Sequence, residues 1–167
     1  MKKWFFLFAG LPVFFSSCSK KDSNSCNYAV STVNVPAAET AYLQNYITTN
    51  SIPANDTLGI FYTINTTGTG DSAAICSIIT INYTGTLLSN GTIFDSNNSP
   101  SGVSFVLGQF IVGLQRAIPL IRRGGDITVY IPPTLAYGAY DRTDGNGNVV
   151  VPANSYLKFD IHLLAIQ

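Results

Sequence analysis

The hydrophobic and polar positions of this chain change pattern twice along its 167 residues. Residues 4–15 form an apolar run behind Lys2 and Lys3, interrupted by Pro12. This run of 12 residues is too short to cross a bilayer, which takes about 20 residues. Its length and its positive start are typical of a signal peptide, so we expect residues 1–17 to be removed.

A helical pattern follows a short polar segment. Pro36 suits the first turn of a helix because its φ is already fixed, and Glu39 places a negative charge near the positive helix end. Apolar residues then recur at helical spacing, at Ala38, Tyr42, Leu43, Tyr46 and Ile47. The pattern predicts one helix that ends near Asn50 and that packs its apolar side on the rest of the protein.

From Leu58 onward, short runs rich in β-branched and aromatic residues predict strands. The predicted strands are residues 59–64, 75–88, a strand that holds Phe94 and Asp95, 103–107, 126–131 and 156–164. Asn90 and Gly91 predict a hairpin, because Asn-Gly accepts the positive φ angles of tight turns. We therefore expect the strand of Tyr83 to pair antiparallel with the strand of Asp95.

The order of these elements predicts an α+β fold, in which an antiparallel sheet curls around one short helix at residues 111–121. Residues 138–151, between the last two strands, are expected to form a long loop. The predicted divisions of the chain are a signal peptide at 1–17, a tether at 18–36, a helical extension at 37–57 and a main domain at 58–167.

Composition narrows the class of protein. Charged residues make up only 11% of the chain, whereas about 25% is typical of soluble domains. Asn, Ser, Thr and Gly cover the surface instead, which is common in extracytoplasmic β-rich proteins. The net charge is zero and no long run of Lys or Arg is present, so nucleic acid is not expected as a partner.

The end of the apolar run, Phe15-Ser16-Ser17-Cys18, resembles the lipobox of bacterial lipoproteins. The resemblance implies that Cys18 is lipidated and becomes the first residue of a mature chain of 167 − 17 = 150 residues. It also implies a location in the bacterial cell envelope, anchored by the lipid and facing the periplasm. An ordinary secretory signal with an incidental cysteine is the alternative.

Cys26 and Cys76 remain as an even pair in an oxidising compartment, which predicts a disulfide between them. The bond would clamp the N-terminal segment onto the start of a central strand. Two free thiols are the alternative.

Six short strings share one order and spacing with a known family. They are Ile81-Asn82-Tyr83-Thr84-Gly85, Phe94-Asp95-Ser96, Phe105-Val106-Leu107-Gly108, Phe110-Ile111-Val112-Gly113-Leu114, Ala136-Tyr137-Gly138, and the closing stretch from Val151 to Asp160. Over residues 59–167 they resemble the FKBP-type peptidyl-prolyl cis-trans isomerases. The resemblance implies an FKBP-like half-barrel of antiparallel strands around one short helix, to which the N-terminal helix is an addition.

The resemblance also implies a site for a substrate proline ring. Tyr83, Asp95 and Tyr137 would be the catalytic residues, with the Tyr137 hydroxyl on a substrate carbonyl and Asp95 close to the rotating amide. The substrate-binding residues would be Phe94, Phe110, Ile111, Leu114, Val151 and Phe159. The backbone N–H of Ile111 would donate to the substrate.

These residues contain no pair of nucleophile and base, and bond rotation needs none. Rotation about a peptide bond faces a barrier of about 18–20 kcal/mol, because the planar amide is stabilised by resonance. The twisted amide is less polar, so a dry aromatic pocket favours it over the planar form. The expected function is isomerisation of X-Pro bonds in extracytoplasmic proteins, with no cofactor and no metal.

Two departures from the family leave other hypotheses open. Leu114 stands where the family usually has Trp, and Val103 where an aromatic residue is frequent. Both favour a chaperone or adaptor that binds proline segments with little or no isomerase activity. A structural lipoprotein whose aromatic residues are ordinary core is a further alternative.

The remaining expectations concern partners and ions. The run from Asp144 to Asn148 lacks the glycine and the closing Glu of a calcium loop, so no metal is expected there. His162 is expected to face solvent. The partners are proline-containing polypeptides and, through Cys18, a membrane. The short helical extension favours a monomer.

Overall fold

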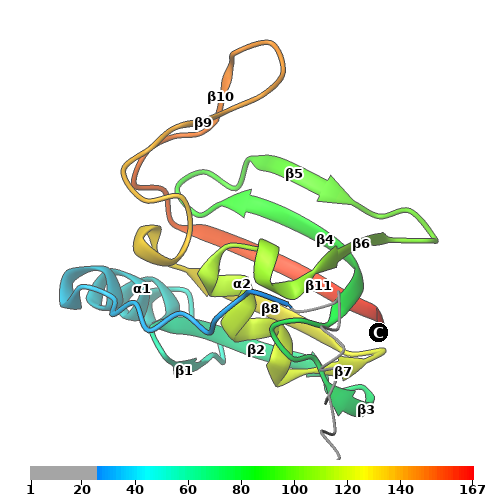
Figure 1. Ribbon diagram of the computed structural model, residues 1–167. Helices are drawn as coiled ribbons and strands as arrows, with labels where there is room; N and C mark the ends of the chain where they lie inside the picture. Colours follow the sequence, from blue (N-terminus) through cyan, green and yellow to red (C-terminus); the bar gives the residue numbers. More distant parts are fainter. Residues whose placement is uncertain (1–25) are drawn as a thin grey trace, which may run out of the picture.

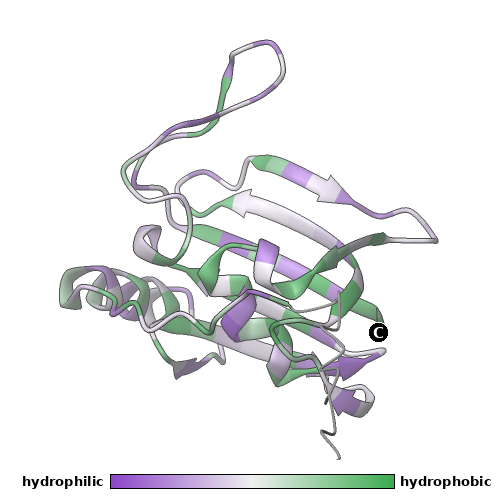
Figure 2. Cartoon of the chain, in the orientation of Figure 1, coloured by the Kyte–Doolittle hydropathy of each residue, from purple (hydrophilic) through white to green (hydrophobic). Residues whose placement is uncertain are grey.

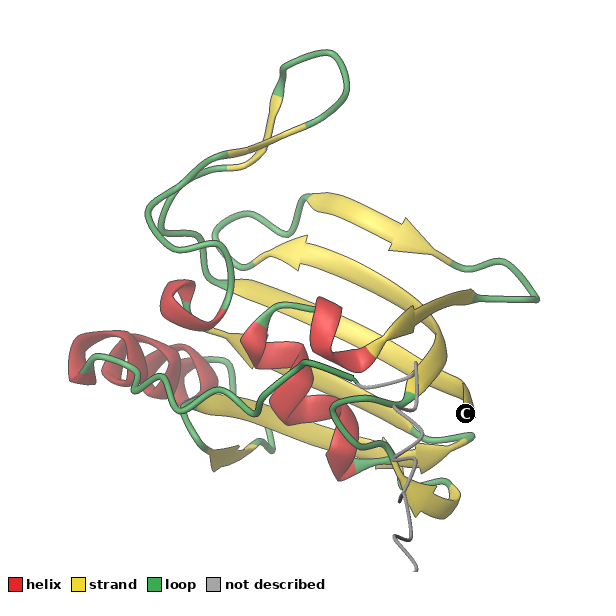
Figure 3. Cartoon of the chain, in the orientation of Figure 1, coloured by secondary structure: helices red, strands yellow, loops and turns green. Residues whose placement is uncertain are grey.

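The computed structural model describes residues 26–167, so the predicted signal peptide and Cys18 lie outside the described residues. One helix precedes a run of six strands, and a second short helix precedes five further strands, with short 3-10 turns (η) between some of them (Figures 1 and 3). The elements are α1 (Ala37–Thr49), β1 (Asn55–Thr57), β2 (Ile60–Thr66), β3 (Thr69–Ser72), β4 (Ile78–Leu87), β5 (Ile93–Asn97), β6 (Val103–Val106), η1 (Leu107–Gln109), α2 (Val112–Ala117), η2 (Ile118–Leu120), β7 (Arg122–Arg123), β8 (Asp126–Ile131), η3 (Pro133–Leu135), β9 (Arg142–Thr143), β10 (Val149–Val151) and β11 (Leu157–Ile166).

The main sheet is antiparallel and runs in the order β1-β2-β8-β11-β4-β5, with β6 also paired to β4. Along one edge of β4, β5 pairs with the half that holds Tyr83, and β6 pairs with the half that holds Ile79. The sheet curves around α2, which lies across its concave face (Figure 1). The predicted α+β class, with an antiparallel sheet curled around one short helix, is confirmed.

The concave face holds the main hydrophobic core. Alternate residues of the central strands point into it, because successive side chains of a strand face opposite sides of the sheet. Helix α2 contributes Gly113, Leu114 and Ala117, all buried. A Cβ on Gly113 would lie 2.4 Å from Ile131 Cγ2, so glycine here lets the helix approach β8 closely.

Helix α1 packs on the opposite face of the sheet. Its buried residues Leu43 and Ile47 contact Phe61 on β2 and Tyr130 on β8. Phe61 and Tyr130 are cross-strand partners, and their neighbours along each strand face the concave core. The carboxylate of Glu39 also accepts hydrogen bonds from the backbone N–H and the hydroxyl of Thr134 in η3. The prediction that this helix packs on the main domain is confirmed.

Beyond α1, the outer face of the sheet is polar. His162 Nδ1 lies 2.7 Å from Asp126 Oδ1, and Lys158 forms an ion pair with Asp160. Thr128 donates a hydrogen bond to the same carboxylate of Asp160. His162 is therefore half-exposed, as expected, and has a carboxylate partner that the sequence does not reveal.

The predicted hairpin at Asn90 and Gly91 joins β4 to β5, and Gly91 has a φ of +73°. The predicted loop at residues 138–151 is instead a second hairpin, made of β9 and β10, that extends away from the sheet (Figure 1). Most of it is hydrophilic, apart from the valines of β10 (Figure 2). The backbone N–H groups of Asn146 and Asn148 donate to Asp144, and this closes its tip.

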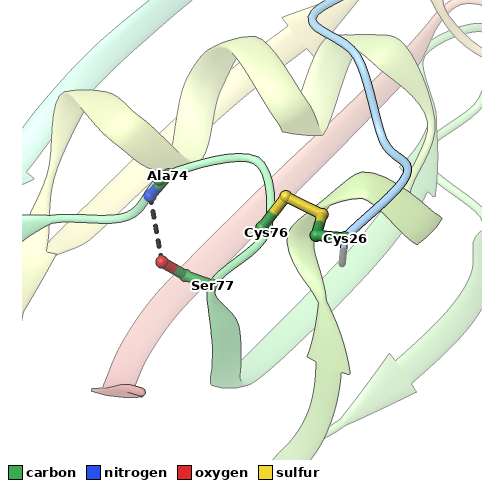
Figure 4. Close-up of a disulfide and its surroundings, with 4 residues drawn as sticks. All are labelled: Cys26, Ala74, Cys76 and Ser77. Atoms are coloured by element: carbon green, nitrogen blue, oxygen red, sulfur yellow. Dashed lines mark hydrogen bonds between the residues drawn. A yellow bond between two sulfur atoms is a disulfide. The ribbon is translucent and has the colours of Figure 1, made fainter. Parts of the chain in front are cut away.

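Residues 26–36, the described part of the predicted tether, lie against the domain in an extended conformation. The guanidinium of Arg116 on α2 donates hydrogen bonds to the carbonyls of Leu58 and Val33. A disulfide joins Cys26 to Cys76, with the two Cα atoms 5.7 Å apart (Figure 4). No helix within residues 26–167 is long and apolar enough to cross a membrane.

Candidate active site

A cavity of about 240 Å³ opens on the concave face, between α2 and the strands. Seven of the predicted site residues line it: Tyr83, Asp95, Phe110, Ile111, Leu114, Tyr137 and Phe159. They come from β4, β5, the N-terminal end of α2, the turn after η3, and β11. The fold thus brings together residues that lie up to 76 positions apart in the chain (159 − 83).

The polar centre of the cavity is a pair formed by Tyr83 and Asp95. The Tyr83 hydroxyl donates a hydrogen bond of 2.7 Å to Asp95 Oδ2. The pairing of β4 with β5 shifts register between Gly85 and Thr86, and this leaves Phe94 as an extra residue on β5. Such a bulge redirects side chains. As a result Phe94 and Asp95, although adjacent in sequence, both reach the concave side.

The aromatic wall is built on Gly85. Phe159 lies beside Tyr83, with ring centroids 6.4 Å apart, and Phe94 packs edge-on against Phe159 at 5.6 Å. A Cβ on Gly85 would approach the Phe94 ring to 2.7 Å and the Phe159 ring to 2.9 Å. Phe94 is not among the side chains that line the cavity. Its edge-on contact with Phe159 makes it a support of the wall, and a direct contact of Phe94 with the substrate stays a prediction.

We expect Gly85→Ala to lower the free energy of unfolding by about 1–3 kcal/mol, as other substitutions that overpack a core do. The added methyl group would push the two rings apart, and urea unfolding followed by tyrosine fluorescence measures the loss. Gly145→Ala is the matched control, because nothing lies within 4 Å of its added Cβ. Equal stability of the two variants would contradict this account of the wall.

The floor of the cavity comes from Ile111 and Leu114. Leu114 is only 4% exposed. Ile111 precedes the first turn of α2, so its N–H lies outside the hydrogen-bond ladder of the helix. Gln115 Nε2 donates to the carbonyls of Gly108 and Phe110, and this holds the segment before α2 in place.

Tyr137 follows η3 at the other side of the cavity. The Gly138 N–H donates to the Pro133 carbonyl, and Gly138 adopts a φ of +62°, so the chain turns sharply just after Tyr137. Burial raises the pKa of the Tyr137 hydroxyl; the Arg142 charge opposes this shift and the Asp95 charge adds to it. Burial, followed by the hydrogen bond to Asp95, also raises the pKa of Tyr83. Both hydroxyls therefore stay protonated and able to donate at neutral pH.

The lining of the cavity differs from the predicted set in two residues that are absent and three that are added. Val151 was expected to line it, but Val151 is 2% exposed and belongs to the hydrophobic core at the end of β10. The lining also includes three residues that the sequence did not indicate: Ile81, Gln109 and Arg142. Strand alternation with Tyr83 could have found Ile81. Only the folded β9–β10 hairpin brings Arg142 to the cavity.

The chemistry available in the cavity is limited to hydrogen bonding, apolar contact and charge. Two phenol hydroxyls, one carboxylate and one guanidinium lie among apolar side chains. Within residues 26–167, no group of three or more His, Cys, Asp or Glu residues could hold a metal ion. The arrangement suits a ligand that combines an apolar ring with a neighbouring carbonyl.

The fold agrees with comparisons to known proteins. Residues 70–164 match the family model of the FKBP-type peptidyl-prolyl cis-trans isomerases, which is more than half of the chain. The chain therefore belongs to the FKBP-type family.

Bacterial relatives are similar in sequence and structure. FkpA of Aeromonas hydrophila is 36% identical over 110 residues, which cover 65% of this chain and 38% of that protein. The crystal structure of FkpA from Escherichia coli has 30% identity and a TM-score of 0.64, and the match covers 78% of this chain and 60% of the other. A peptidyl-prolyl cis-trans isomerase from Pseudomonas syringae has 25% identity and a TM-score of 0.62, over 81% and 98% of the two chains. This chain spans only 38–49% of the length of the curated FkpA relatives that it matches.

Proposed function

We propose that this protein is a peptidyl-prolyl cis-trans isomerase of the bacterial cell envelope, acting on X-Pro bonds of extracytoplasmic proteins by non-covalent catalysis. The observation that carries the proposal is the cavity itself, in which Tyr83, Phe159 and Leu114 enclose an apolar space beside the Asp95 carboxylate and the Tyr137 hydroxyl. Membership of the FKBP-type family supports the same reaction.

The mechanism follows from the difference between the planar and the twisted amide. The proline ring packs against Tyr83 and Phe159, above Leu114. The protonated Tyr137 hydroxyl and the Ile111 N–H donate to substrate carbonyls, and so position the peptide on either side of the rotating bond. Twisting removes charge from the carbonyl oxygen. The twisted form therefore loses less hydration free energy than the planar form when it leaves water. The cavity binds the transition state more tightly than the substrate, and about 8 kcal/mol of such preference would give a 10⁶-fold acceleration.

A chromogenic X-Pro peptide assay on the full chain in detergent tests the proposal. We expect a rate of cis-to-trans conversion well above the spontaneous rate, which takes tens of seconds or longer. A folded sample that leaves the spontaneous rate unchanged would refute it. If that sample still bound proline peptides, the chaperone or adaptor hypothesis would replace it.

Leu114 is the feature that favours the adaptor hypothesis, since a smaller side chain leaves a shallower contact for the proline ring. We expect Leu114→Trp to raise kcat/KM for a Leu-Pro peptide about two- to tenfold, because added apolar contact in a pocket contributes about 1 kcal/mol. The variant keeps Gly113, because a side chain at that position would clash with Ile131 on β8. A Trp variant that is folded and less active would show that Leu114 already fits the substrate.

The location rests on the N-terminal sequence. Cys18 would carry the lipid, and the domain would face the periplasm as a monomer. Replacing Cys18 with alanine is expected to release the protein from the membrane fraction, while the Cys26→Ser variant stays bound. A soluble wild-type protein would contradict the anchor, and a dimer in analytical ultracentrifugation would contradict the monomer.

A further inference from the structure

The geometry points to Arg142 as a specificity-determining residue, one that favours substrates with an acidic residue adjacent to the proline. This inference rests on the proposed function, because it concerns the same cavity. It adds a charge preference to a site whose other contacts are mostly apolar.

Arg142 reaches the cavity from the β9–β10 hairpin. Its guanidinium carbon lies 4.9 Å from the centre of the Tyr137 ring, over the face of that ring. The base of the hairpin is fixed, because Arg142 pairs with Val151 across the two strands and the Asp141 carboxylate accepts a 2.7 Å hydrogen bond from the Ala153 N–H. A guanidinium stacked on an aromatic ring keeps its N–H edge available for a carboxylate.

No residue of the described chain neutralises this charge. Arg142 is exposed, and no carboxylate within residues 26–167 lies at ion-pair distance from it. The carboxylate in the cavity, Asp95, is instead bonded to the Tyr83 hydroxyl. A substrate carboxylate at this rim would therefore meet an unpaired cation that is already held in place.

The two ends of the site differ in charge, so we expect only one of the two positions next to the proline to show the preference. A second cavity of about 480 Å³ continues from the first past Gln109 and Phe110 to Phe105, whose ring packs edge-on against Phe110. Tyr83, Gln109 and Phe110 line both cavities, whereas Arg142 and Tyr137 line only the first. The rim near Phe105 is apolar and the rim near Arg142 is cationic. An extended peptide would thus place an apolar side chain at one rim and an acidic one at the other.

The test compares isosteric peptides that differ only in charge. Acetylated and amidated peptides carry Glu or Gln directly before the proline in one pair and directly after it in a second pair. NMR exchange measures isomerisation, and titration measures the Kd of each peptide. The full chain is used in detergent. In one of the two pairs, we expect the Glu peptide to bind and to be isomerised roughly three- to fivefold better than its Gln partner, as an exposed ion pair allows. Raising the salt concentration is expected to shrink this ratio.

Arg142→Gln is expected to bring the Glu-to-Gln ratio to about one, and Arg142→Glu to invert it in favour of the Gln peptide. Arg123→Gln is the matched control, since Arg123 lies on β7, outside the site, and its loss should leave the ratio unchanged. Equal Glu-to-Gln ratios in the wild type and in Arg142→Gln would overturn the inference. If no peptide were isomerised, the ratio of Kd values would decide the role of Arg142, and the isomerase proposal alone would fail.

Discussion

Replacing Asp95 with alanine is expected to lower kcat/KM for X-Pro peptides roughly 10- to 100-fold. A hydrogen bond to a charged group contributes about 1.5–3 kcal/mol, and 1.4 kcal/mol corresponds to a factor of ten. The substitution removes the charge beside the rotating amide and leaves the Tyr83 hydroxyl, 2.7 Å away in the wild type, without its acceptor. A protease-coupled or NMR exchange assay measures the loss.

Two further variants distinguish a direct effect of the Asp95 charge from an effect that acts through the Tyr83 hydroxyl. Asp95→Asn keeps an acceptor oxygen near Tyr83 but removes the charge, while Tyr83→Phe removes the hydroxyl and keeps the ring. If the carboxylate acts by its charge, Asp95→Asn should lose about as much activity as Asp95→Ala. If it acts only through Tyr83, then Asp95→Ala and Tyr83→Phe should have similar effects that do not add. A folded Asp95→Ala protein with wild-type activity would exclude both roles.

Removing the disulfide is expected to lower the free energy of unfolding by about 4 kcal/mol, according to the chain-entropy relation for a loop of this size. Cys26 and Cys76 are 50 positions apart, so the bond restricts a long segment of the unfolded chain. Both cysteines are exposed, and serine can therefore replace them without leaving a cavity. A total stability of roughly 5–15 kcal/mol is usual, which makes this loss a large fraction. Urea unfolding of the double variant Cys26→Ser/Cys76→Ser measures it.

The reductant supplies the control. Adding it to the wild type should reproduce the stability of the double variant, and adding it to the double variant should change nothing. The disulfide also stabilises a segment next to the active site. The carbonyls of Ile75 and Ser77, on either side of Cys76, accept hydrogen bonds from the backbone N–H groups of Gly108 and Leu107 in η1. A wild type that is equally stable with and without reductant would show that the bond does not constrain the unfolded chain.

Much of the fold could be predicted because its signals are local. The helical spacing that starts after Pro36 predicts α1, which runs from Ala37 to Thr49. Asn90 and Gly91 predict the hairpin that sets Tyr83 opposite the strand of Asp95. Each of these signals depends on residues within a few positions of one another, where dihedral preferences and periodicity act without help from the rest of the chain.

The features that were missed depend on contacts between distant segments. The bulge that packs Phe94 edge-on against Phe159 arises from the register between β4 and β5, and it needs Gly85 to make room for both rings. Val151 belongs to the core, because the hairpin that carries it returns to the sheet at that residue. A pattern of single residues does not contain this information.

The sequence by itself determined the longer strands of the main sheet, the two α-helices, the short hairpin and the choice of aromatic and acidic residues for the site. Periodicity and turn chemistry decide these locally. The tertiary structure alone decided that α1 covers the outer face of the sheet, that a bulge packs Phe94 edge-on against Phe159, and that Arg142 lies over Tyr137 at the rim of the cavity. These three depend on how closely packed elements meet in space, and such packing is set by side-chain volumes and strand register across the whole domain.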